Sequence, residues 1–273
     1  MIPRFQATPA ETTYAQVVAH FPGRSPGAAE RLRLWREQPG KRDKVVPFVE
    51  RCVTRFLYDV TPGDVEQACE RTIHALGSVN GVEARSVSLI VDWHPAFAFQ
   101  HVLHFVLEDG RRVPAYQDLR DRARASSEVQ MMLTQPAQDT VSQAIKDGTD
   151  RELARDAMRW RVGNAYLSFL RELYVISVLR EAGVDARYHV LADVLFRVDC
   201  WVDDLCLSLS IKNEKFLDGA TGRKTPAEEI VTGGPFRFAR LELPTRHEYG
   251  NVHLPDRDDI LGAADGLTGP RRV

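Results

Sequence analysis

The sequence predicts a mixed α/β protein in two parts, and three observations lead to this prediction. Helical periodicity is sustained over residues 152–182. Alternation of apolar and polar side chains, typical of strands, follows over residues 195–212. A polar, charged stretch at 118–150 marks a boundary before these elements. We therefore expect an N-terminal α+β module over residues 1–135 and an α/β domain over residues 150–273.

The composition is that of an ordinary globular protein. The chain has 273 residues, of which 44% are hydrophobic and 27% charged, and its formal net charge is −2. These values exclude a disordered chain and a uniformly basic coat protein for nucleic acid. The four cysteines lack the spacing of a zinc site, and no apolar run approaches the ~20 residues of a membrane helix. We expect a cytoplasmic protein without a membrane partner.

The N-terminal module is expected to combine helices with two strands. Residues 1–24 are weakly patterned and predict a lightly docked arm. The expected helices cover residues 28–38, 45–58 and 62–76, and the expected strands cover residues 86–93 and 101–107. His101 and His104 would then face opposite sides of a strand, so they do not predict a metal pair.

The C-terminal part is expected to follow the order α-β-β-β-α-β. Gly183 ends the long helix. The expected elements after it are strands at 188–191, 195–202 and 205–212, a glycine-rich loop at 218–223, a short helix at 226–231 and a strand at 236–243. The C-terminal tail, with its cluster of aspartates from Asp256, is expected to be frayed.

The two strands around Asp203-Asp204 predict a hairpin with one apolar and one polar face. A two-residue turn there pairs Val202 with Leu205, and the same register continues back along both strands. It pairs Cys200 with Leu207, Val198 with Leu209 and Phe196 with Ile211. Side chains alternate along a strand, so an acid, hydroxyls and a lysine gather on the opposite face. That face includes Arg197, Asp199, Ser208, Ser210 and Lys212. A half-buried hairpin with a solvated face gives the same pattern, and this alternative stays open.

Glu172 interrupts the apolar stripe of the long helix. At 100° per residue it lies between Ile176 and Leu179, on the side that should face the core. A carboxylate in that position needs a partner or a chemical role. The alternative is that it reaches solvent or pairs with a nearby arginine, such as Arg171 or Arg180.

Taken together, residues 150–245 resemble the PD-(D/E)XK nuclease superfamily, with its restriction-endonuclease-like α-β-β-β-α-β core. In that family a helix carries a glutamate, the second strand an aspartate, and the third strand an acid, any residue, then a lysine. Glu172 matches the helix glutamate, Asp199 the strand aspartate, and Lys212 the lysine 13 residues further on. One position departs from the pattern, because Ser210 stands where the family usually has an acid or glutamine.

The resemblance implies a catalytic site and a metal cofactor. The implied catalytic residues are Glu172, Asp199, Ser210 and Lys212. Mg²⁺ or Mn²⁺ would be held by Glu172, Asp199 and the backbone carbonyl of Ile211, and Lys212 would orient the attacking water. Serine is a short neutral ligand, so Ser210 puts catalytic activity in doubt more than the fold. An unrelated α/β fold with a fortuitous aspartate and lysine also stays open.

The implied function is metal-dependent endonuclease cleavage of DNA, in phage defence, restriction or transposition. The alternative is a catalytically degenerate nuclease-fold subunit that binds nucleic acid or a partner protein. Arg223 and Lys224, in the glycine-rich loop, would contact DNA phosphates. Between Arg24 and Lys44, seven cationic residues outnumber three acids, a local balance of +4. This segment predicts either contact with a nucleic-acid backbone or a solvated, ion-paired surface.

Overall fold

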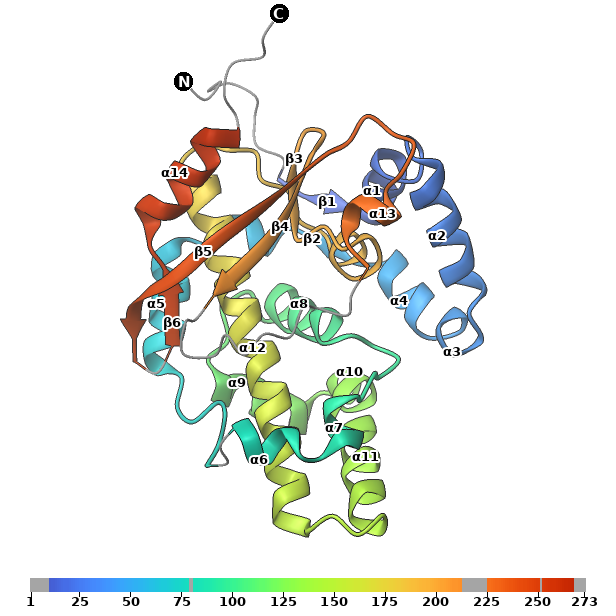
Figure 1. The fold of residues 1–273 in the computed structure, drawn as a ribbon, viewed down its shortest axis with the longest axis vertical. Coiled ribbons are helices and arrows are strands. Elements are labelled where there is room, and N and C mark those ends of the chain that lie inside the picture. The colour runs from blue at the N-terminus through green and yellow to red at the C-terminus, as the bar shows by residue number, and fades with distance from the viewer. Residues whose placement is uncertain (1–9, 79–80, 213–224, 251, 268–273) are drawn as a thin grey trace, which may run out of the picture.

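The computed structural model describes residues 10–78, 81–212, 225–250 and 252–267. It is a mixed α/β structure in which a four-stranded sheet, built by the C-terminal part, lies among helices (Figure 1). One buried apolar cluster contains residues from Val17 near the beginning of the chain to Ala264 near its end. The sheet and most of the helices therefore share one core.

Helices dominate the first part of the described chain. They are α1 (Tyr14–His20), α2 (Pro26–Glu37), α3 (Pro39–Arg42), α4 (Val45–Glu50), the 3₁₀ turn η1 (Phe56–Asp59), α5 (Pro62–Arg71), α6 (Gly81–Arg85), α7 (Ser88–Val91) and α8 (Phe99–Gly110). Two short strands, β1 (Thr12–Thr13) and β2 (Val53–Thr54), pair antiparallel. The predicted helices at 28–38 and 62–76 are present, although the second ends at Arg71, and the side chains of Ser25 and Thr61 cap them.

Two predictions in this part are wrong because short apolar runs do not separate helix from strand. Residues 86–93 and 101–107, expected as strands, lie in or next to α7 and in α8. In α8 the imidazole of His101 accepts the backbone N–H of Ala98 at the helix start. Residues 101–107 are all buried or half-buried in this helix and five of the seven are apolar, so the run has no polar face that would reveal a helical period. The helix expected at 45–58 ends at Glu50, and the expected N-terminal arm contains α1.

The polar stretch at 118–150 is mostly helical. It contains α9 (Tyr116–Ala125), α10 (Ser127–Val129), the π turn η2 (Gln130–Thr134) and α11 (Gln135–Lys146). Its polar character comes from exposed helix faces rather than from a linker. The division into residues 1–135 and 150–273 stays a prediction.

Helix α12 (Arg151–Glu181) joins the helical part to the sheet. Asp150 caps its first turn by accepting the backbone N–H groups of Glu152 and Leu153. Gly183, with φ of +84°, follows its C-terminal end, as the sequence predicts. The helix packs on α6, α7 and α11 with one end and against the sheet side of the molecule with the other. It therefore carries Glu172 from the helical part to the sheet.

The sheet contains β3 (Cys200–Val202), β4 (Leu205–Lys212), β5 (Arg237–Tyr249) and β6 (Val252–Pro255), in that order. Strands β3 and β4 form the expected hairpin, with Val202 opposite Leu205 and Cys200 opposite Leu207. Strand β5 runs parallel to β4 after the short helix α13 (Ala227–Ile230), and β6 returns antiparallel. A parallel neighbour needs such a crossover connection.

Of the first two predicted strands of the C-terminal part, one is absent and the other is shorter than expected. Residues 188–191 contribute no strand, and the strand signal there is one antiparallel bridge between Arg187 and Trp201. Residues 192–196 form a π turn, η3 (Ala192–Phe196), so the predicted pairing of Phe196 with Ile211 is wrong. Instead of fraying, the C-terminal tail adds β6 and helix α14 (Arg257–Leu267).

Candidate active site

Asp199 lies where the β3–β4 hairpin opens. Its backbone N–H donates to the carbonyl of Leu207 at 3.0 Å, and its carboxylate accepts the backbone N–H of Leu209 at 2.6 Å. If β3 continued, a backbone carbonyl of that strand would accept the N–H of Leu209. The Asp199 carboxylate accepts it instead. This contact fixes the Asp199 carboxylate against β4, one residue before Ser210.

Near Asp199, the charges of three carboxylates raise the pKa of the same two buried side chains, Tyr188 and Cys200. Burial raises the pKa of the Tyr188 phenol and the Cys200 thiol well above their ordinary values. The negative charges of Glu172, Asp193 and Asp199 raise both pKa values further. Glu172 comes from the middle of α12, Asp193 from η3 and Asp199 from the start of the hairpin. We call these three residues the carboxylate cluster.

Asp193 is a member of this cluster that the sequence reasoning missed. It is only 4% exposed, and its carboxylate accepts the hydroxyl of Tyr188 at 3.2 Å. The available signal was a single acid inside the apolar run of residues 192–196. A buried carboxylate of this kind needs hydrogen bonds or charge partners, and Tyr188 supplies one of them.

The two arginines considered as partners of Glu172 make other contacts as well. Arg171 donates from Nε to the carbonyl of His253 at 3.0 Å. Arg180 donates to the carbonyl of Ala186 at 2.9 Å, and its guanidinium lies 3.9 Å from the centre of the Tyr58 ring. The charge of Glu172 nevertheless opposes the burial that lowers the pKa of Arg171.

Ser210 is bound by a cation from the neighbouring strand. The guanidinium of Arg240 donates to its hydroxyl at 3.1 Å, and Ser210 lies directly opposite Glu242 in the parallel β4–β5 register. The Glu242 carboxylate is 3.8 Å from the Nε of Arg240. The position where the family carries an acid is therefore surrounded here by a serine, an arginine and a glutamate.

The remaining predicted site residues are placed only in part. The backbones of Ile211 and Lys212 end β4, opposite Leu243 and Pro244 of β5. Their side chains lie outside what the structure describes. The same holds for Arg223 and Lys224 with their whole loop. Their predicted roles at the site stay predictions.

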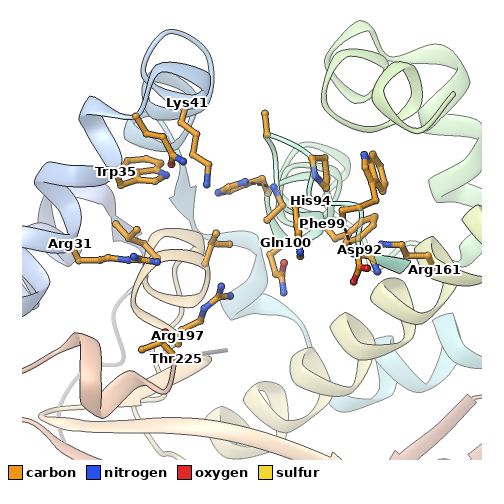
Figure 2. Close-up of a pocket in the computed structure, with 18 of the residues that line it drawn as sticks. Arg31, Trp35, Lys41, Asp92, His94, Phe99, Gln100, Arg161, Arg197 and Thr225 are labelled. Atoms are coloured by element: carbon orange, nitrogen blue, oxygen red, sulfur yellow. Dashed lines mark hydrogen bonds between the residues drawn. The ribbon is translucent and has the colours of Figure 1, made fainter. Parts of the chain in front are cut away.

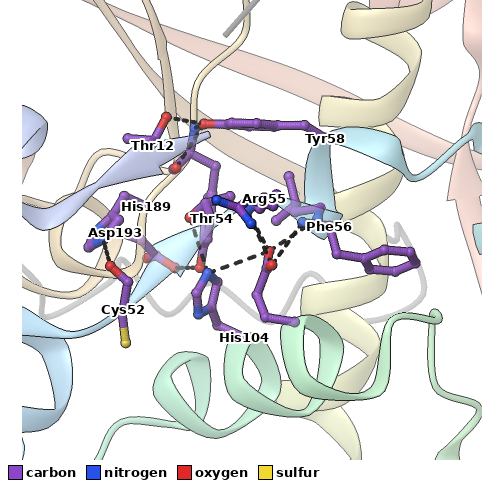
Figure 3. A network of polar contacts seen from close by, with 12 residues as sticks. Thr12, Cys52, Thr54, Arg55, Phe56, Tyr58, His104, His189 and Asp193 are labelled. Atoms are coloured by element: carbon purple, nitrogen blue, oxygen red, sulfur yellow. Dashed lines mark hydrogen bonds and ion pairs between the residues drawn. The ribbon is translucent and has the colours of Figure 1, made fainter. Parts of the chain in front are cut away.

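A buried polar network supports the carboxylate cluster from the side of β1 and β2 (Figure 3). The Tyr58 hydroxyl accepts the backbone N–H of Tyr188 and donates to its carbonyl, both at 3.0 Å. His104 contacts the hydroxyl of Thr54 at 3.1 Å, and His189 contacts the carbonyl of Cys52 at 3.0 Å. These bonds hold the segment that carries Tyr188 and Asp193 in one position.

A cleft of about 1550 Å³ opens near Asp199 (Figure 2). One wall comes from α2 and α3, and the opposite wall from residues 88–101 with Arg161 of α12. Val194, Leu195 and Arg197 line it where η3 ends. Arg197 and Asp199 are two residues apart, so their backbones are within ~7 Å of each other. The lining of the cleft thus comes within two residues of Asp199 along the chain, although none of the three carboxylates of the cluster lines it.

Within the part of the chain that the structure describes, no three His, Cys, Asp or Glu side chains form a group that could hold a metal ion. The same residues include no helix with the length and apolar character needed to cross a bilayer. Comparison with protein-family profiles, curated proteins and solved structures finds no match to this chain. Only the residues of this chain and their geometry therefore indicate its function.

Proposed function

We propose that this chain is a metal-dependent endonuclease that hydrolyses phosphodiester bonds in DNA. The observation that carries the proposal is the carboxylate cluster at the opening of the β3–β4 hairpin, beside the strand that ends in Lys212. A carboxylate placed at such an opening can contact a ligand that also approaches the end of β4. Glu172 adds a second acid from a different element.

The order of elements supports a restriction-endonuclease-like core as part of this proposal. Helix α12 precedes the bridge at Arg187, the β3–β4 hairpin, α13 and the parallel strand β5. This order is similar to the α-β-β-β-α-β order expected from the sequence, but an isolated bridge stands where the first strand is expected. The sheet order and the β4–β5 crossover are compatible with that core.

The residues fit a hard divalent cation with few protein ligands. Mg²⁺ is commonly held by one or two carboxylates plus water. Glu172 and Asp199 would supply the carboxylates, and the backbone carbonyl of Ile211 a third oxygen. When bound, such an ion polarises the scissile phosphate and lowers the pKa of a bound water. Lys212 would orient the water and offset the charge that develops on the phosphate.

The test is cleavage of supercoiled plasmid with Mg²⁺ and with Mn²⁺. Asp199→Asn removes the charge but keeps an oxygen that can accept the Leu209 N–H, so it should fold. We expect it to lose nicking activity by at least ~10–100-fold, the range for loss of even an outer-shell partner of a metal ligand. Asp203→Asn, at an exposed position in the turn of the same hairpin, is the control and should cleave like the wild type. No metal-dependent nicking by the wild type, or equal nicking by Asp199→Asn, contradicts the proposal.

A second candidate function follows from Arg240. Its guanidinium beside Ser210 places a positive charge where the family has a metal-binding acid. This observation favours a catalytically degenerate nuclease fold that binds nucleic acid or a partner protein. In that case wild type is inactive, and the double substitution Ser210→Asp with Arg240→Gln should create metal-dependent nicking. If the wild type cleaves and the double substitution changes its rate little, the degenerate alternative is wrong.

A further inference from the structure

The cleft near the carboxylate cluster contains a convergent group of cations. Arg31 and Lys41 enter it from the side of α2 and α3, and Arg197 enters it from the end of η3 (Figure 2). No carboxylate among the described residues forms an ion pair with any of these three side chains. Burial lowers the pKa of Lys41, and the positive charges of Arg31 and Arg197 lower it further. The three cations therefore repel one another across the cleft, and the two acids of the described chain that also line it, Glu37 and Asp92, form no ion pair with them.

Four of the five other cations of the same basic segment are paired with acids. Arg24 binds Asp204, Arg36 binds Glu50, and Arg42 binds Asp43. Arg33 lies two residues from Arg31 on α2 and binds both Glu30 and Glu37. Most of the segment is therefore ion-paired surface, as one of the two sequence alternatives predicts. Arg31 and Lys41 differ, because they face the cleft.

The backbone conformation of Arg197 is energetically unfavourable. Its φ is +62° at the C-terminal end of η3, in the left-handed region where glycine is usual. A non-glycine residue in that region costs on the order of 1 kcal/mol. Residues in unfavourable backbone conformations are concentrated at binding sites. This observation is independent of the charge argument and points to the same cleft.

Aromatic rings line the wall opposite the cations. Trp93 and Phe99 pack edge to face with ring centres 5.7 Å apart, and both are partly exposed. Arg161 of α12 fixes this wall by donating to the carbonyls of Val91 and Trp93. Cations that bind a backbone together with aromatic rings that stack on bases are the two components of single-strand binding sites. A duplex keeps its base faces stacked inside and offers none to such rings.

We infer that this cleft binds single-stranded nucleic acid, with Arg31, Lys41 and Arg197 on the phosphates and Trp93 and Phe99 on the bases. Its volume of about 1550 Å³ exceeds the ~300–1,000 Å³ of typical small-ligand pockets, which favours a polymer. The inference builds on the proposed function, since it gives the form in which the substrate would reach Asp199. Binding needs no metal, however, so it can be measured separately from cleavage.

The test is fluorescence anisotropy of labelled oligothymidylate in EDTA, with wild type and a variant carrying Arg31→Gln, Lys41→Gln and Arg197→Gly. Each phosphate contact contributes about 0.7 to the slope of log affinity against log salt for a single strand. We expect the triple variant to lose about 2 units of that slope and to bind at least ~10-fold more weakly at low salt. Arg33→Gln changes the net charge on the same helix but lies outside the cleft, and it should bind nearly as the wild type does.

A duplex of the same length provides the second arm, and we expect it to bind more weakly than the single strand. Equal binding by wild type and the triple variant overturns the inference, even if the protein cleaves DNA. Tighter binding of the duplex that the triple variant also loses overturns the single-strand assignment. If the triple variant loses binding while wild type shows no cleavage, the cleft inference holds and the proposed chemistry fails.

Discussion

Arg197 combines an unfavourable backbone conformation with a side chain in the cleft. The backbone strain arises because residue 197 is an arginine; a glycine adopts a φ of +62° without an energetic cost. Arg197→Gly should therefore leave the free energy of unfolding unchanged or raise it by up to ~1 kcal/mol. Arg31→Gly, inside α2, is the matched control and should lower it by ~1 kcal/mol. Urea unfolding of both variants checks this, and a clear loss of stability in Arg197→Gly would mean that the side chain has a structural role.

At the scale of elements, α12 depends on one close approach to the helical part. A Cβ on Gly163 would overlap the carbonyl oxygen of Ala75 and lie 2.8 Å from its carbonyl carbon. Because Gly163 has no Cβ, the backbone of Ala75 can pack directly against α12, the helix that carries Glu172. Any shift of α12 at this contact would move Glu172 relative to Asp199.

Gly163→Ala should be destabilising although alanine is the better helix former. Overpacking against backbone costs ~1–3 kcal/mol, which exceeds the ~1 kcal/mol of helix propensity that alanine adds. Gly262 in α14 has open space around its Cα, so Gly262→Ala should raise stability by up to ~1 kcal/mol. Thermal denaturation of the two variants should move the midpoint in opposite directions. A rise for Gly163→Ala would show that the contact with residue 75 is not tight.

At the scale of the whole molecule, buried imidazoles couple folding to pH. Burial lowers the pKa of His101 and His104 to about 3 and that of His189 to about 4, against an ordinary value of 6.5. Their neutral forms are held in the folded protein, whereas the unfolded chain takes up protons below pH ~6.5. The stability they contribute is complete above that pH and is lost as the pH falls toward the folded values.

Unfolding should therefore take up about three protons from these residues between pH ~6 and ~5. That uptake corresponds to a loss of up to ~4 kcal/mol per pH unit, above the range in which most carboxylates titrate. Urea unfolding at several pH values measures it. His104→Gln should reduce the slope by about one proton, whereas His94→Gln, at an exposed position, should leave it unchanged. A stability that is flat over this range would contradict the burial of these imidazoles.

The features that were predicted correctly from the sequence are those that local sequence patterns determine. The β3–β4 register follows from a two-residue turn with apolar residues on both sides, and the long helix follows from periodicity, a capping Asp150 and Gly183. Helix α7 was missed because its four residues are too few to show a helical period, and α8 because residues 101–107 are buried or half-buried and have no polar face to reveal one.

The candidate site was predicted only for residues that match a motif. The charges of Glu172 and Asp199 raise the pKa of the same two buried groups, Tyr188 and Cys200, but nothing in a motif predicts Asp193. The cleft was also beyond sequence reasoning, since it joins Arg31 to Arg197 across 166 positions of the chain. Which cations are paired and which face the cleft depends on tertiary structure alone.

In the proposed function, Glu172 and Asp199 together hold a divalent cation. Titration of the protein with Mn²⁺, followed by the electron paramagnetic resonance signal of the free ion, tests it without relying on activity. We expect wild type and Asp203→Asn to bind one ion per chain with the same affinity, and Asp199→Asn and Glu172→Gln each to weaken binding by ~10-fold or more. Absence of bound Mn²⁺ in the wild type, or binding that neither Asp199→Asn nor Glu172→Gln weakens, would contradict the account.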